Sequence, residues 1–141
     1  MASIKTLVAD DYLPFRTLLK EFLACDPESE LVGEACCGED ALAKALQLGP
    51  DVVVMDITLP GLTTLETLRL IKARMPETKI IVLLEEDNRE YRRASFEAGA
   101  DACLAKLAAG KELALLIRAL YVPRPRWASV GTSGPEFRQA I

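Results

Sequence analysis

The 141-residue sequence contains no histidine, and this absence excludes several kinds of chemistry at once. Without histidine the chain has no Ser-His-Asp or Cys-His catalytic group, no phosphohistidine and no Cys/His zinc site. The four cysteines, Cys25, Cys36, Cys37 and Cys103, form no C-x-x-C pair. We expect four reduced and mostly buried thiols. Any chemistry must therefore use carboxylates, lysine, hydroxyl groups or a metal.

The sequence also lacks a long apolar run, a glycine-rich phosphate loop and an excess of basic residues. No apolar run approaches the roughly 20 residues of a membrane-spanning helix, and no basic-then-apolar leader follows Met1. We therefore expect a cytoplasmic protein without membrane contact. The missing glycine-rich loop argues against nucleotide binding. With 17 Lys and Arg against 21 Asp and Glu, the net charge is −4, which argues against contact with nucleic acid.

Half of the residues are apolar, and their pattern is typical of an α/β fold. Short apolar runs predict strands, and longer segments with apolar residues at helical spacing predict helices. The predicted strands are residues 4–9, 31–36, 52–55, 79–84 and 102–105. The predicted helices are residues 12–24, 39–48, 63–75, 88–98 and 110–122. Such alternation predicts a doubly wound, five-stranded parallel sheet with right-handed crossovers and helices on both faces.

This pattern predicts one domain over residues 1–122. Residues 123–141 are rich in proline and glycine and show no apolar period. We predict that they form a C-terminal extension that is either flexible or docked through Trp127 and Phe137. The extension is too short for a DNA-binding helical module.

Charged residues stand at the ends of three of the five predicted strands. Asp10 and Asp11 follow the first strand, Asp56 ends the third, and Lys106 follows the fifth. Ligands of parallel α/β sheets bind outside the carboxyl ends of the strands, so we expect these groups to meet there. Converging carboxylates are tolerated around a divalent cation, and oxygen-only ligands suit Mg²⁺ or Mn²⁺. One carboxylate can then attack phosphorus, while the lysine pairs with a phosphoryl oxygen.

Three segments together resemble the response-regulator receiver family of bacterial two-component systems. They are Asp10-Asp11, Val-Val-Val-Met-Asp-Ile-Thr-Leu-Pro-Gly at residues 52–61, and Gly-Ala-Asp-Ala-Cys-Leu-Ala-Lys at residues 99–106. Lys-Ile-Ile-Val-Leu at residues 79–83 also fits the fourth strand of that family. The resemblance covers about residues 4–121. It implies a flavodoxin-like sheet with strand order 2-1-3-4-5.

The resemblance also implies roles for the charged residues. Asp56 would accept a phosphoryl group from a histidine kinase or a histidine phosphotransfer protein, and Lys106 would contact that group. The ligands of Mg²⁺ or Mn²⁺ would be Asp10, Asp11, Asp56 and the backbone carbonyl of Thr58. Thr58 and Glu86 would tune the lifetime of the phosphoryl group. Output would pass through a downstream protein partner or self-association, and the chain would not be an enzyme.

Three positions depart from the family's usual pattern. Leu84 stands where the family has a switch Thr or Ser, and Cys103 stands where it has a switch aromatic residue. Leu107 follows Lys106 in place of a proline with a cis peptide bond. A cis bond before a non-proline residue costs about 2.5–4 kcal/mol. We predict that Asp56 is phosphorylated but that the usual movement of the fourth helix and fifth strand is weakened or absent.

Two alternative functions remain open at this point. The first is a receiver-fold interaction module that works largely independently of phosphorylation. The second is a Mg²⁺-dependent phosphatase or phosphotransferase with a nucleophilic aspartate. That class generally carries another aspartate two residues after the nucleophile, where this chain has Thr58.

Overall fold

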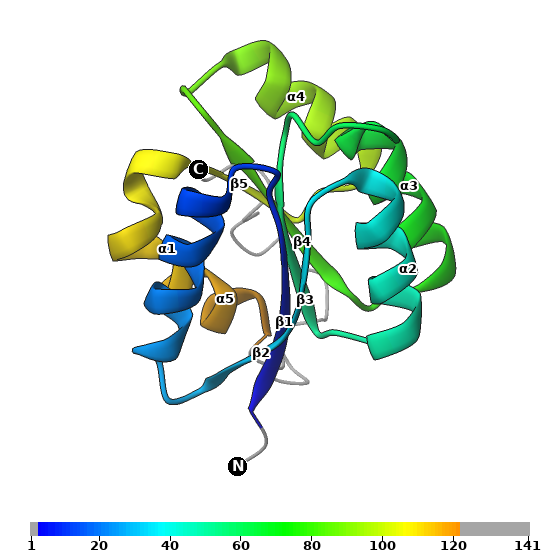
Figure 1. Ribbon diagram of the computed structural model, residues 1–141. Helices are drawn as coiled ribbons and strands as arrows, with labels where there is room; N and C mark the ends of the chain where they lie inside the picture. The colour runs from blue at the N-terminus through cyan, green and yellow to red at the C-terminus, as the bar shows by residue number, and fades with distance from the viewer. Residues whose placement is uncertain (1–2, 122–141) are drawn as a thin grey trace, which may run out of the picture.

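The computed structural model describes residues 3–121, in which helices cover both faces of a central parallel sheet (Figure 1). The strands are β1 (Ile4–Ala9), β2 (Ser29–Ala35), β3 (Val52–Asp56), β4 (Lys79–Leu84) and β5 (Ala102–Ala105). The helices are α1 (Leu13–Ala24), α2 (Gly38–Leu48), α3 (Thr64–Arg74), α4 (Arg89–Ala98), the 3-10 helix η1 (Lys106–Ala108) and α5 (Ala109–Tyr121). All strand pairs are parallel, in the order β2-β1-β3-β4-β5. The predicted fold class and strand order are confirmed.

The sheet separates two apolar cores. Helices α1 and α5 cover one face, and α2, α3 and α4 cover the other (Figure 1). Alternate residues of β3 contribute to each core: Val53 and Met55 pack on the side of α2 and α3, while Val52 and Val54 pack on the side of α1 and α5. Every residue of β3 is buried, as expected for a central strand covered on both faces.

The predicted boundaries agree with the structure to within about two residues, and the differences have local causes. Strand β2 begins at Ser29 rather than at residue 31, because Ser29 and Glu30 pair with β1 despite their polar side chains. The hydroxyl of Thr63 caps α3 by accepting the amide of Glu66 at 3.2 Å. Gly99, with a φ of 117°, ends α4 in the left-handed conformation that glycine adopts at low cost.

Gly38 brings the start of α2 against the loop between β3 and α3. Its amide donates a hydrogen bond to the carbonyl of Pro60 at 3.1 Å. A Cβ atom at Gly38 would lie 1.9 Å from the carbonyl oxygen of Leu62. The adjacent Glu39 carboxylate accepts the amide of Leu62 at 2.9 Å. The start of α2 therefore fixes the loop that continues from Asp56.

We expect Gly38→Ala to lower the free energy of unfolding by about 3 kcal/mol, at the upper end of the usual range for overpacking. The added methyl group overlaps backbone atoms, which cannot rotate away as a side chain can. Urea denaturation measures the change. Gly49→Ala is the control, because a Cβ atom there meets nothing within 4 Å and the cost comes only from a φ of 57°. Equal losses in the two variants would contradict a close approach at Gly38.

Some predictions fall on parts of the chain that the structure does not describe. Residue 122, the predicted end of the last helix, and the predicted extension 123–141 with Trp127 and Phe137 lie outside the described residues. The division into residues 1–122 and 123–141 therefore stays a prediction. Within residues 3–121, no helix is both long and apolar enough to cross a membrane.

Candidate functional site

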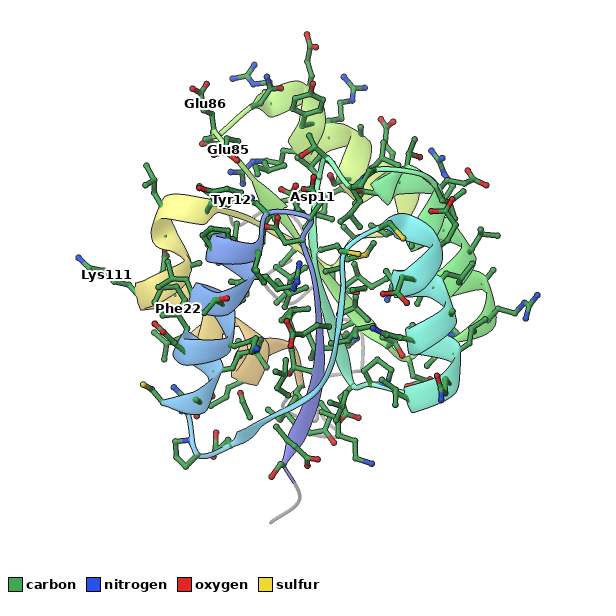
Figure 2. All side chains as sticks on the ribbon, viewed as in Figure 1. Asp11, Tyr12, Phe22, Glu85, Glu86 and Lys111 are labelled. Atoms are coloured by element: carbon green, nitrogen blue, oxygen red, sulfur yellow. The ribbon has the colours of Figure 1, made fainter. Side chains whose placement is uncertain are left out.

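Acidic side chains gather where β1 and β3 end at one edge of the sheet. Asp10 directly follows β1, Asp11 comes next, and Asp56 is the last residue of β3. One carboxylate oxygen from each of the three lies within 4.8 Å of the others. Asp10 and Asp56 are buried, whereas Asp11 is exposed. Figure 2 shows Asp11 at the same end of the molecule as Glu85, which follows β4.

The ammonium group of Lys106 lies among these acidic side chains. Its Nζ atom is 2.9 Å from Oδ2 of Asp10, 3.3 Å from Oδ1 of Asp56 and 3.6 Å from Oε2 of Glu85. Lys106 is the first residue of η1, directly after β5, so the end of the fifth strand places it at this edge. The ring of Phe15, on α1, lies with its centroid 4.5 Å from Nζ. The structure thus brings together Asp10, Asp11, Asp56 and Lys106, as the strand ends predict.

Short hydrogen bonds orient the two buried carboxylates. Oδ2 of Asp56 accepts the Thr58 hydroxyl at 2.7 Å, and Oδ1 of Asp10 accepts the Tyr12 amide at 2.9 Å. The hydroxyl of Thr64 donates to the backbone carbonyl of Asp56 at 2.6 Å and accepts the amide of Leu59. Each buried carboxylate therefore has one oxygen held by its own loop, which leaves the other oxygen directed at Lys106.

The site carries more negative charge than one ammonium group neutralises. Burial raises the pKa of Asp10, and the Lys106 ammonium and the Tyr12 amide offset only part of that rise. Burial alone would lower the pKa of Lys106, but the hydrogen bond with Asp10 and the charges of Asp56 and Asp10 raise it above its usual value. The carboxylates therefore favour a second positive charge.

The donor set fits a small divalent cation. Apart from the Lys106 ammonium, Oδ2 of Asp10 and Oδ1 of Asp56 accept no hydrogen bond from the described residues, although both atoms are buried. Buried oxygens of this kind need a partner, and the Asp11 carboxylate lies in reach of the same point. Three carboxylates without histidine or cysteine suit Mg²⁺ or Mn²⁺. The Thr58 carbonyl as a further ligand stays a prediction.

A cavity of about 610 Å³ opens over the acidic group. Its polar lining consists of Asp10, Asp11, Asp56, Thr58, Glu85 and Lys106. Its apolar lining includes Phe15, Leu18, Phe22 and Leu107. Figure 2 shows Phe22 on α1, on the side that faces α5. The cavity connects the buried carboxylates of Asp10 and Asp56 to the surface.

Leu84 and Cys103, which the resemblance places at the family's switch positions, pack in the core and do not line the cavity. Leu84 ends β4 and lies in the core beneath α2, α3 and α4, and Cys103 on β5 belongs to the same core. Burial raises the pKa of the Cys103 thiol to about 11. The bond between Lys106 and Leu107 is trans, as are all peptide bonds among residues 3–121, and the Leu107 side chain is exposed.

The expectation of mostly buried cysteines is wrong. Cys25 and Cys36 are exposed, Cys37 is half-buried, and only Cys103 is buried; all four are free thiols. Cys25 is the residue after the last turn of α1, and Cys36 and Cys37 form the turn between β2 and α2. Cysteine is often buried as a small apolar residue, but these three stand at element ends that face solvent.

Sequence analysis missed three residues that shape the site: Glu85, Phe15 and Thr64. Glu85 directly follows β4, so the strand-end argument applied to the fourth strand would have found it. Phe15 reaches the site from α1, and Thr64 holds the Asp56 backbone from the first turn of α3. Neither residue has a sequence signal that separates it from an ordinary core or capping residue.

Comparison with known proteins agrees with the fold and the site. The family model of the response regulator receiver domain matches residues 6–118 of this chain. The chain is 37% identical over 142 residues to a protein-glutamate methylesterase/protein-glutamine glutaminase of Nocardioides sp., a match that covers all of this chain and 34% of that relative. It is 36% identical over 118 residues to response regulator GacA of Pseudomonas aeruginosa, covering 84% of this chain and 55% of GacA.

The crystal structure of the response regulator domain of Thermotoga maritima CheB superposes with a TM-score of 0.77 and 30% identity. That superposition covers 86% of this chain and 99% of the CheB domain. The chain thus spans between about a third and just over half of the length of the two curated relatives. Since the family match covers most of the chain and the acidic edge of the sheet has the expected residues, the chain belongs to the response regulator receiver domain family.

Proposed function

We propose that Asp56 accepts a phosphoryl group from a phosphohistidine of a histidine kinase or a histidine phosphotransfer protein in the cytoplasm. An Asp56 oxygen attacks phosphorus, and the bond between phosphorus and the donor's nitrogen breaks. The electron pair stays on the histidine ring, which takes up a proton, and Asp56 becomes an acyl phosphate. The observation that carries this proposal is the position of Asp56 Oδ1, 3.3 Å from Lys106, with both residues lining the cavity.

The residues around Asp56 have different proposed roles. The Thr58 hydroxyl holds Oδ2 and so fixes the plane of the carboxylate. Lys106 would pair with a phosphoryl oxygen as charge builds on it. Asp10, Asp11 and Asp56 would hold Mg²⁺, which when bound neutralises negative charge on the phosphoryl oxygens. Asp56 is itself modified and turns over no free substrate, so we propose that this chain is not an enzyme.

Treatment with acetyl phosphate and Mg²⁺ tests this function without a partner protein. Intact-mass measurement is expected to show one added phosphoryl group with Mg²⁺ and none with EDTA. Peptide mapping is expected to place the group on Asp56. An unmodified protein at saturating acetyl phosphate, or an adduct on another residue, would contradict the proposal.

A second candidate is an interaction module that works without phosphorylation. Its support is the loss of both switch side chains, together with a Leu107 side chain that is 98% exposed beside the cavity. A failure of phosphoryl transfer would favour this module. The phosphatase alternative has less support, because a hydroxyl at Thr58, and not a carboxylate, contacts Asp56.

Output is proposed to pass through a downstream protein partner or through self-association. The curated relatives are longer than this chain, and one of them is named for methylesterase and glutaminase activities. Those activities are properties of that relative, and nothing among residues 3–121 assigns them to this chain.

We expect phosphorylation to leave α4 and β5 nearly unchanged. A bound group shifts an equilibrium only through contacts that differ between the two states. Leu84 has no hydroxyl to bind the phosphoryl group, and Cys103 has no ring to rotate. Both side chains are packed in the core. Amide chemical shifts of residues 84–106, recorded with beryllofluoride and Mg²⁺, measure this response. Large shifts far from Asp56 would contradict it.

A further inference from the structure

Lys106 contacts a carboxylate that the proposed transfer does not use. Besides Asp10 and Asp56, Nζ lies 3.6 Å from Oε2 of Glu85. Glu85 follows the last residue of β4 and also lines the cavity. Figure 2 shows Glu85 at the same edge as Asp11, next to Glu86 in the chain. Three carboxylates therefore lie within ion-pair distance of one ammonium group.

The three carboxylates near Lys106 differ in their freedom to move. The side chains of Asp10 and Asp56 are 0% and 3% exposed, and each is held by a hydrogen bond from its own loop. The side chain of Glu85 is 79% exposed. An exposed glutamate changes rotamer without disturbing a core, so Glu85 is the partner that can leave Lys106.

Three carboxylates and an aromatic ring already lie close to Nζ, where a further anion would have to bind. An ammonium group has three N–H donors, and here three carboxylates lie within ion-pair distance. The Phe15 ring covers another side, with its centroid 4.5 Å away. An oxygen of an incoming phosphoryl group must therefore replace one of these carboxylates. Glu85 is the one that leaves at the lowest cost.

We propose that Glu85 pairs with Lys106 in the unphosphorylated protein and competes with the phosphoryl group for that lysine. This inference rests on the proposed function. The negative charge of Glu85 also opposes a dianionic group at the same point. Glu85 therefore lowers the affinity of the site for a phosphoryl oxyanion, and its removal strengthens binding.

Beryllofluoride with Mg²⁺ is a probe of the phosphoryl position that requires no donor. We expect Glu85→Gln to bind beryllofluoride about threefold to fivefold more tightly than wild type at low salt, the upper part of the range for an exposed ion pair. Salt screens exposed charges, so the difference shrinks as the salt concentration rises. Glu85→Asp keeps the charge on a shorter side chain and is expected to fall between the two. Titrations followed by amide chemical shifts measure all three affinities.

Glu90→Gln is the matched control. Glu90 is exposed in the first turn of α4, and its substitution removes the same charge without touching the cavity. It is expected to bind the probe as wild type does. An unchanged affinity of Glu85→Gln for beryllofluoride, or an equal gain in affinity in both variants, would overturn the proposed competition of Glu85 with the phosphoryl group. If wild type itself binds no beryllofluoride and takes up no phosphoryl group, the proposed function fails and this inference fails with it.

Discussion

Asp56→Asn is expected to abolish phosphorylation and to keep the fold. The amide has nearly the shape of the carboxylate, and its oxygen still accepts the Thr58 hydroxyl, which lies 2.7 Å from Oδ2 in wild type. The amide oxygen is a much weaker nucleophile and forms no acyl phosphate under these conditions. After treatment with acetyl phosphate and Mg²⁺, the intact mass of the variant should show no added group. Circular dichroism checks that the fold is kept.

Asp87→Asn serves as the control for this substitution. Asp87 is an exposed carboxylate between β4 and α4 that pairs with Arg92, and it lies outside the cavity lining. Its substitution removes the same charge, so the yield of phosphorylation should match that of wild type. A phosphorylated Asp56→Asn variant with wild-type yield would place the acceptor on another residue.

Lys106→Met is expected to lower the free energy of unfolding by about 3 kcal/mol at neutral pH in EDTA, the cost of leaving a buried ion pair without one partner. Methionine replaces the apolar stem of the lysine, so the loss comes mainly from the missing charge. Asp10 and Asp56 then remain buried without the ammonium group that lies within 3.3 Å of both. Urea denaturation measures the difference from wild type.

The pH dependence of this loss identifies its cause. Burial already raises the pKa of Asp10 in the folded protein, and removal of Lys106 raises it further. A carboxyl group with a raised folded-state pKa binds protons more readily when folded than when unfolded. Its contribution to stability is therefore least favourable above that pKa and improves as the pH falls through it. The loss in free energy of unfolding caused by Lys106→Met should be largest at neutral pH and should shrink toward acidic pH.

Two further measurements separate charge from packing. Mg²⁺ should recover part of the stability of Lys106→Met, because a cation among the carboxylates supplies the missing positive charge. Lys111→Met is the control, since Lys111 is exposed on α5 and points away from the site (Figure 2). A loss of stability in Lys106→Met that is no greater than in Lys111→Met, or that does not change with pH, would rule out charge neutralisation.

The sequence predicts the bounds of strands made of apolar residues better than the bounds of a strand that begins with polar residues. Strands β4 and β5 have the predicted bounds because their runs are apolar on both faces and end at charged residues. The edge strand β2 begins earlier than predicted, because backbone pairing with β1 includes Ser29 and Glu30 whatever their side chains are. Strand order follows from the family resemblance and could not be read from periodicity alone.

The sequence likewise predicts one part of the site and not the other. Asp10, Asp11, Asp56 and Lys106 meet because the carboxyl ends of parallel strands share one edge, a rule that needs only the order of elements. The contact of Glu85 with Lys106 depends on a side-chain rotamer in a loop. The position of Phe15 depends on how α1 packs beside η1. Such details need coordinates, and so does the exposure of the cysteines at element ends.

The packing of Gly38 and Glu39 against Pro60 and Leu62 has a consequence for comparing related chains. Neither Gly38 nor Glu39 lines the cavity, yet both hold the loop that leaves Asp56. A natural replacement at the beginning of α2 would therefore shift the proposed cation ligands through the main chain alone. Two proteins with the same acidic residues would then differ in metal affinity, and counting aspartates would not rank them.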